Sequence, residues 1–335
     1  MAWGSGTANF ASLVTPETGI QNVVVANGGA FESITNNYAY NQIQTLASRA
    51  SVALVFVNAD SGEGFISVDG NVGDRNNLTL WVDGDILIRN VSALCNNTIV
   101  VVHSVGAVLL GDYSTNPNVT AILWAGIPGE QSGNAIADIL YGRVNPGAKL
   151  PFTMAAARKD YGTDLLYEPN GPVPQIDFTE GIFIDYRALD RASIEPVYEF
   201  GFGLSYTTFS YSNLQITRTQ AGPYTPTTGM TAAAPTFGTI SNNSADYVFP
   251  SNITRIPIYI YPYLNNTDLK ASADDANYGL PGFVPAGAQD GSPQPRVAAG
   301  GAPGGNPELW DVLYQVTATI TNTGKVAGEE VPQLV

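Results

Sequence analysis

Apolar residues form short continuous runs in the first half of the chain and alternate with polar residues only near its end. Four apolar runs predict strands, at residues 22–27, 52–58, 98–105 and 121–124. Three segments with helical periodicity predict helices between them, at residues 40–50, 77–95 and 131–141. Continuous apolar strands that alternate with helices are typical of a parallel sheet covered on both faces. We therefore predict an α/β sandwich domain over residues 1–157.

The pattern changes after this domain. Residues 158–200 lack clear periodicity and predict a connecting segment. Residues 221–310 hold 12 of the 22 prolines of the chain, which excludes long regular elements there. Residues 314–321 alternate strictly between apolar and polar types, as in a half-buried antiparallel strand. A further strand is expected to begin within residues 326–335.

Composition narrows the possible functions. The 335 residues suggest about two domains. The net charge is −15, and only 13% of the residues are charged. A nucleic-acid-binding protein would need a basic face, so this class is excluded, and a neutral substrate fits the acidic balance better. The chain contains no run of 18 or more apolar residues, so no membrane span is predicted.

Seven Asn-x-Ser/Thr sequons indicate a secreted glycoprotein. They lie at Asn77, Asn90, Asn96, Asn118, Asn242, Asn252 and Asn265. The first residues lack the basic and apolar regions of a signal peptide, so an extracellular location implies that a signal precedes Met1. Cys95 is the single cysteine and is expected to be a buried small hydrophobic residue, with a lost disulfide partner as the alternative.

Glu63 is the strongest candidate for chemistry. It lies in Gly62-Glu63-Gly64, just beyond the predicted strand at 52–58. Ligands of open α/β sheets bind outside the carboxyl ends of the strands, and glycines allow the backbone to approach a ligand closely. A carboxylic acid there can give a proton to a leaving group. The alternative is a solvated acidic turn.

Other hydrolytic chemistries find less support. His103 is the only histidine, and the chain has no Gly-x-Ser-x-Gly elbow for a Ser-His-Asp hydrolase. Clustered His or Cys ligands for a metal are also absent from the sequence. We expect His103 to be a structural residue at a strand end.

Six segments, in order along the chain, resemble glycoside hydrolase family 3 β-glucosidases, especially the secreted fungal branch. They are ADSGEG (59–64), DRNNL (74–78), WAGIPGEQSG (124–133), GRVNPGAKLPFT (142–153), EGIFIDYR (180–187) and YEFGFGLSYTTF (198–209). The family implies a barrel, then an α/β sandwich, then a fibronectin type III-like β-sandwich. By this resemblance the chain lacks the barrel and the start of the α/β domain. The terminal β-sandwich would cover residues 201–335, truncated, with a Pro/Gly-rich insertion at about 218–310.

The resemblance also assigns residues. Retaining glycosidases use two carboxylates about 5–5.5 Å apart; Glu63 matches the acid/base, whereas the nucleophile belongs to the absent barrel. Ser5 matches a sugar-contacting position, and Phe65 an aromatic position beside the aglycone; a flexible turn and local packing are the respective alternatives. No metal or organic cofactor is implied.

The predicted function is therefore part of a retaining β-glucosidase, which removes terminal non-reducing β-D-glucosyl units from cellobiose and other β-glucosides. Its partners would be the β-glucoside or cello-oligosaccharide substrate and the missing barrel, with no nucleic acid or membrane. The chain alone is expected to be inactive, because it lacks the nucleophile. A non-catalytic carbohydrate-binding protein and an inert truncated product are the alternatives.

Overall fold

A computed structural model describes residues 8–64, 66–219, 229–230, 233, 292–293 and 311–334. The chain divides into two compact units. The first contains residues 1–212 and 320–335, and the second contains residues 213–319.

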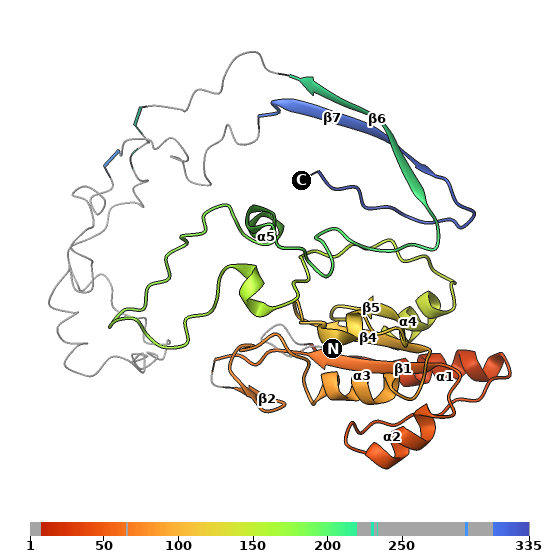
Figure 1. The fold of residues 1–335 in the computed structure, drawn as a ribbon. Helices are drawn as coiled ribbons and strands as arrows, with labels where there is room; N and C mark the ends of the chain where they lie inside the picture. The colour runs from red at the N-terminus through yellow and green to blue at the C-terminus, as the bar shows by residue number, and fades with distance from the viewer. Residues whose placement is uncertain are drawn as a thin grey trace, which may run out of the picture. The chain divides into compact units, whose positions relative to one another are not determined.

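A three-stranded parallel sheet lies at the centre of the first unit (Figure 1). Its strands are β1 (Ala53–Ala59), β4 (Thr98–Ser104) and β5 (Val119–Trp124), in the order β1-β4-β5. Three of the predicted strands and their parallel pairing are thus confirmed. All three strands point the same way, so their carboxyl ends form one edge of the sheet.

Helices cover both faces of this sheet. One face carries Val55, Val57 and Val100, and it is covered by α2 (Tyr40–Ala47) and α3 (Gly84–Ser92). The other face carries Phe56 and Val101, and it is covered by α1 (Pro16–Ala26) and α4 (Ser132–Leu140). The remaining short elements of the first unit are β2 (Ser67–Val68), β3 (Asn71–Val72), η1 (Gly111–Ser114), η2 (Arg158–Tyr161) and α5 (Tyr186–Ala192). The α/β class is therefore confirmed.

The strand predicted at residues 22–27 is wrong, because this run forms the second half of α1. Thr15 caps the helix by accepting a hydrogen bond from the Thr18 N–H at 3.2 Å, and Pro16 occupies the first turn. Both are helix-start signals. They outweigh the β-branched run at 23–25, since propensity is a weak preference that capping and packing override.

The helix predicted at residues 77–95 is shorter than expected. Only residues 84–92 are helical, because Val82 and Asp83 have positive φ values of 53° and 54°, which a right-handed helix cannot contain. The Trp81 N–H instead donates to the Asn58 carbonyl at 2.8 Å, and the Trp81 side chain is buried. Leu80 and Trp81 thus join the core from a loop, whereas Val82 is exposed.

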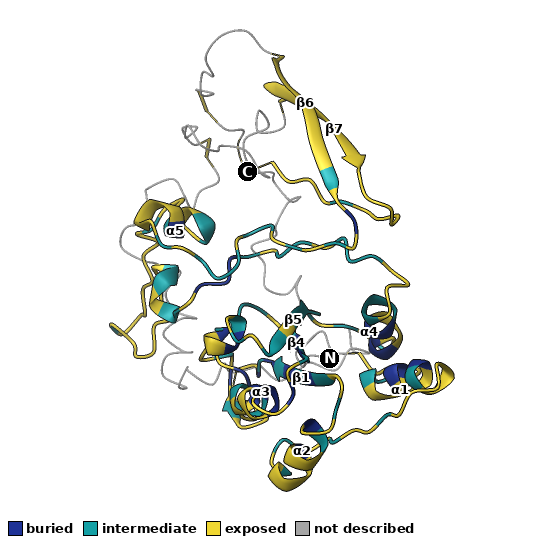
Figure 2. Ribbon diagram, turned by 45° about the vertical axis from the view of Figure 1, so that its right-hand side comes forward, coloured by how far each residue is buried: buried dark blue, intermediate teal, exposed yellow. Residues whose placement is uncertain are grey.

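β6 (Phe209–Arg218) and β7 (Tyr314–Asn322) pair as a two-stranded sheet. β7 confirms the strand predicted at 314–321, but the prediction that it is half-buried is wrong. Every residue of β7 is exposed, as Figure 2 shows in yellow. The segment 326–334 forms no strand, which contradicts the further strand expected there.

α1 and α4 meet through glycines. A Cβ atom built on Gly133 would lie 2.0 Å from the Thr15 carbonyl oxygen, and one on Gly19 would lie 2.3 Å from the Gly133 carbonyl oxygen. The Gly133 N–H also donates to the Val14 carbonyl at 2.8 Å. The backbones therefore touch where the two helices begin, and no side chain fits between them.

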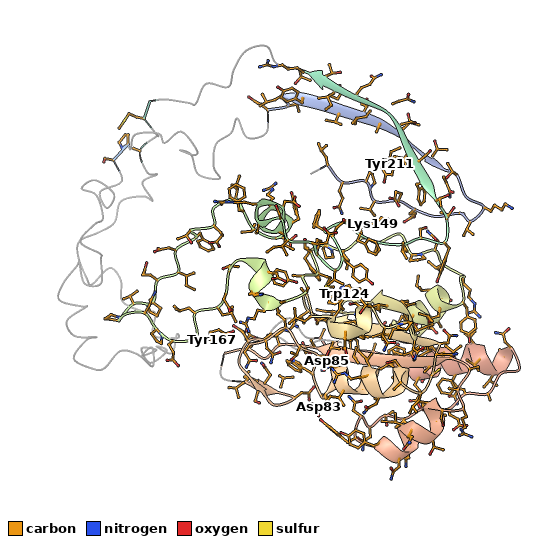
Figure 3. All side chains as sticks on the ribbon, viewed as in Figure 1. Asp83, Asp85, Trp124, Lys149, Tyr167 and Tyr211 are labelled. Atoms are coloured by element: carbon orange, nitrogen blue, oxygen red, sulfur yellow. The ribbon has the colours of Figure 1, made fainter. Side chains whose placement is uncertain are left out.

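An ion pair joins the loop after α4 to the carboxyl-terminal segment. The Lys149 ammonium lies 3.3 Å from Glu330 Oε2, and the two side chains are only 13% and 12% exposed. Lys149 also donates to the Gly203 carbonyl at 2.9 Å, and the Tyr211 hydroxyl donates to Glu330 Oε1 at 2.8 Å. Lys149 and Tyr211 are labelled in Figure 3. The pair thus connects three segments that are distant in sequence.

Candidate active site

Glu63 lies beyond the carboxyl end of β1, in a loop that folds back on itself. Its side chain is exposed. The loop contains the β2–β3 hairpin, whose turn, Asp69-Gly70, has two positive φ values of 49° and 84°. This is the backbone of a two-residue hairpin turn that matches the twist of the strands. The predicted candidate thus reaches the expected edge of the sheet and is not part of the core.

The glycines beside Glu63 are required by the path of the backbone. A Cβ on Gly62 would lie 2.4 Å from the Gly73 carbonyl oxygen, so only glycine fits there. Gly64 has a φ of 57°, a conformation that glycine adopts without strain. The turn closes with a hydrogen bond of 2.9 Å from the Ile66 N–H to the Glu63 carbonyl. Glu63 is therefore presented by a constrained turn.

The residues before Glu63 anchor the loop. Asp60 is buried and accepts a hydrogen bond from the Ser61 N–H at 2.8 Å. The Ser61 hydroxyl accepts one from the Arg75 N–H at 3.0 Å, so the two ends of the loop are joined. The Arg75 guanidinium donates to the Ala107 carbonyl in the loop after β4 at 2.8 Å. Arg75 has no distinguishing signal in the sequence beyond its place in the DRNNL segment.

Several predicted residues lie outside the described part of the chain. They are Ser5, Phe65, Asn242, Asn252 and Asn265. Their assignments stay predictions.

The four remaining sequon asparagines differ in accessibility. Asn77, Asn90 and Asn96 are exposed. Asn118 is half-buried, and its amide nitrogen donates to the Ser92 carbonyl at 2.7 Å. An N-linked glycan attaches to this nitrogen, so the folded chain presents the first three sites more openly than Asn118.

Cys95 and His103 are held inside the fold. Cys95 is buried as a free thiol, with its Sγ 3.6 Å from the Ala50 carbonyl oxygen, as expected for a small buried residue. His103 lies near the end of β4, where its ring is 6.1 Å from that of Phe56. It lines a small pocket at the carboxyl edge of the sheet, together with Asn58, Asp60, Ser104, Gly126 and Ile127.

We predict that His103 stays neutral well into acid. Burial lowers the pKa of His103 to about 4, from an ordinary value of 6.5. The unfolded chain takes up this proton near pH 6.5, whereas the folded chain does so near pH 4. The stabilising effect of the neutral ring is thus present above pH 6.5 and is lost as the pH falls through about 4.

Because the chain has one histidine, a single imidazole NMR resonance reports this titration. A midpoint near 4 is expected, and a midpoint near 6.5 would contradict the burial argument. The variant His103→Gln should show a smaller loss of stability between pH 6.5 and 4 than the parent chain does.

A larger groove, of about 440 Å³, runs between α1 and α4. Its polar side chains are Asn22, Asn134, Asp138 and Arg143. Arg143 lies 3.4 Å from Asp138. Among the described residues that line this groove, Asp138 is the single carboxylate, so they do not provide the pair of carboxylates that glycoside hydrolysis uses.

Among the described residues, no group of three or more His, Cys, Asp or Glu side chains is arranged to hold a metal ion. In the same part of the chain, no helix is long and apolar enough to cross a bilayer.

Known proteins resemble this chain in sequence and in fold. Beta-glucosidase A of Aspergillus kawachii is 58% identical over 338 residues, which cover all of this chain and 39% of that protein. A family 3 β-glucosidase structure from Neurospora crassa is 58% identical with a TM-score of 0.81, over 98% of this chain and 40% of that one. A β-glucosidase structure from Chaetomium thermophilum is 55% identical with a TM-score of 0.81, over the same shares of the two chains.

The chain therefore spans about two fifths of the length of the relatives that it matches. Residues 1–206 match the Glycosyl hydrolase family 3 C-terminal domain, which is more than half of the chain. The chain belongs to glycoside hydrolase family 3 and corresponds to the C-terminal part of its β-glucosidases.

Proposed function

We propose that this chain carries the acid/base of a retaining β-glucosidase and that Glu63 is this residue. One observation carries the proposal: the exposed Glu63 side chain stands on a constrained turn at the carboxyl edge of the sheet, within the ADSGEG segment that resembles the acid/base loop of the family. Relatives that are 58% identical bear the name beta-glucosidase, which supports a β-glucoside as substrate.

The two steps of such a reaction use Glu63 in turn. In the first, its carboxyl O–H gives the proton to the glycosidic oxygen as the bond from C1 to that oxygen breaks. A nucleophilic carboxylate on the preceding domain forms the new bond to C1. In the second, the Glu63 carboxylate takes a proton from water as the water oxygen attacks C1 and releases the nucleophile. Two displacements retain the β configuration.

The rest of the architecture follows the family. We propose an α/β sandwich at residues 1–157, a connecting segment at 158–200, and a fibronectin III-like domain at 201–335 with an insertion at about 218–310. The exposure of β6 and β7 supports the fibronectin III-like domain. A two-stranded sheet is only marginally stable by itself, so further strands are expected to pack on it. Secretion and glycosylation at the sequons belong to the same proposal.

The proposal predicts that this chain alone does not hydrolyse an aryl β-glucoside, whereas a full-length polypeptide does. Such a polypeptide can join the preceding part of Aspergillus kawachii Beta-glucosidase A to this chain. We expect Glu63→Gln in it to lower kcat/KM for cellobiose on the order of a hundredfold, because this leaving group needs a proton. 2,4-Dinitrophenyl β-glucoside, whose leaving group needs none, should be affected little.

Steady-state rates on the two substrates provide the measurement. The proposal fails if Glu63→Gln leaves cellobiose hydrolysis unchanged. It also fails if the isolated chain turns over the aryl glucoside. Glucose binding by an inactive full-length polypeptide would instead favour a carbohydrate-binding protein.

A further inference from the structure

Arg75 connects the loop that carries Glu63 to a second loop at the same edge of the sheet. Its backbone N–H donates to the Ser61 hydroxyl, two residues before Glu63, at 3.0 Å. Its guanidinium Nη1 donates to the Ala107 carbonyl, in the loop after β4, at 2.8 Å. Residues 61 and 75 enclose the turn and the hairpin between them. One residue therefore closes this loop and fixes it to its neighbour.

The following residue is held from a third segment. The Asn76 carbonyl accepts hydrogen bonds from Arg158 Nη1 at 3.1 Å and from the Tyr167 hydroxyl at 3.4 Å. The Arg158 guanidinium also lies over the Tyr167 ring, 5.2 Å from its centroid. The end of this loop is thus bonded to the connecting segment as well as to the loop after β4.

The guanidinium of Arg75 is incompletely satisfied. Its Nε and Nη2 atoms are buried and have no hydrogen-bond partner within the described structure. Burial accordingly lowers the pKa of Arg75, an effect that nearby Tyr161 opposes. These two nitrogens form one edge of the guanidinium, and an unpaired buried charge is costly. Arg75 therefore makes a poor contribution to stability, which argues that its hydrogen bonds serve another purpose.

We propose that Arg75 is a positioning residue, which holds the loop of Glu63 against the loop after β4 and so fixes the direction of the Glu63 carboxyl. This inference depends on the proposed role of Glu63 as the acid/base. Proton transfer requires hydrogen-bond geometry between the acid and the leaving oxygen. A small displacement of the loop lengthens this contact, and a misplacement of 1 Å can lower a rate about a hundredfold. Arg75 thus acts on the reaction through Glu63.

The test compares two substrates in the full-length polypeptide described above. Arg75→Met removes the charge and the bond to Ala107 while keeping most of the side-chain volume. We expect kcat/KM for cellobiose to fall about tenfold or more, because this substrate needs the proton. For 2,4-dinitrophenyl β-glucoside, kcat/KM should change less than about twofold. kcat/KM reports the first glycosyl transfer, so slow release of the second product does not mask the difference.

Stability provides an independent measurement. Replacement of an unpaired buried charge by an apolar side chain of similar size is often neutral or stabilising. The melting temperature of Arg75→Met is therefore expected to equal or exceed that of the parent. Arg75→Lys, which keeps one donor for Ala107, should recover part of the rate on cellobiose. Arg49→Met is the matched control, since Arg49 is 60% exposed and pairs with Glu32 at the surface.

Ser61→Ala tests the same loop if Arg75→Met does not fold. It removes the contact to the Arg75 N–H and leaves the guanidinium intact, and the same difference between substrates is expected. An equal fall on both substrates, or no fall on either, would overturn the positioning role. If Glu63→Gln does not lower kcat/KM more for cellobiose than for the dinitrophenyl glucoside, the acid/base proposal is wrong. If Glu63→Gln shows this difference and the Arg75 and Ser61 variants do not, only the positioning inference is wrong.

Discussion

Gly133→Ala should lower the free energy of unfolding of this chain by about 3 kcal/mol, the upper range for an overpacked core site. The added Cβ would lie 2.0 Å from the Thr15 carbonyl oxygen and 2.8 Å from that of Val14. Both are backbone atoms, which cannot rotate away as a flexible side chain can. α1 must move off α4 to make room, and this opens the core formed by Ile20, Val23 and Ile136.

Urea unfolding, followed by tryptophan fluorescence to which buried Trp81 contributes, measures the effect. Gly129→Ala is the matched control, because a Cβ there meets no atom within 4 Å and its φ is not positive. It should be neutral or stabilise the chain by about 0.5 kcal/mol, through a smaller entropy of the unfolded state. Equal stabilities of the two variants would contradict the close approach of α1 and α4.

Lys149→Met should cost about 3 kcal/mol, because removal of one partner leaves a buried charge uncompensated. Glu330, only 12% exposed, would retain the Tyr211 hydroxyl as a partner but lose the ammonium at 3.3 Å. The bond from Lys149 to the Gly203 carbonyl would also be lost. The segment 326–334 should then detach more readily from the rest of the first unit.

A double variant separates the charge effect from packing. Lys149→Met combined with Glu330→Leu removes both charges and should recover most of the lost stability, since apolar pairs often replace buried ion pairs without cost. Thermal melting and limited proteolysis near residue 330 provide the readouts. Additive losses in the double variant would contradict a coupled pair, as would a loss below about 0.5 kcal/mol for Lys149→Met, which is typical of an exposed pair.

The sheet of this protein could be predicted from its sequence because its strands are buried and apolar on both sides. In residues 53–59 and 98–104 the continuous apolar run is the one local signal. Residues 22–27 carry the same signal, yet they are helical, and only Thr15 and Pro16 indicate the difference before the structure is known. The late start of α3, at Gly84 and not near residue 77, depends on tertiary contacts of Trp81, which no local pattern contains.

The candidate site was predictable in part. Gly62-Glu63-Gly64 marks a place where the backbone turns tightly, and the structure explains both glycines. Arg75 stands within the DRNNL segment, but its contacts with Ser61 and Ala107 join it to positions 14 and 32 residues away. Pairings at such separations leave no periodicity in the sequence, so only the folded chain reveals them.

The outer strands of the parallel sheet have a consequence for solubility. Within the described residues, β1 and β5 each have a neighbour on one side only. Natural proteins guard such edges with charges, proline or bulges. Neither ALVFVNA nor VTAILW contains a charged residue or a proline, and the one register shift of β5 lies at its start, between the partners of Thr98 and Ile99. Apolar, uncharged segments of this length favour cross-β stacking between molecules. Unless other polypeptide shields these edges, aggregation will compete with folding when the chain is produced.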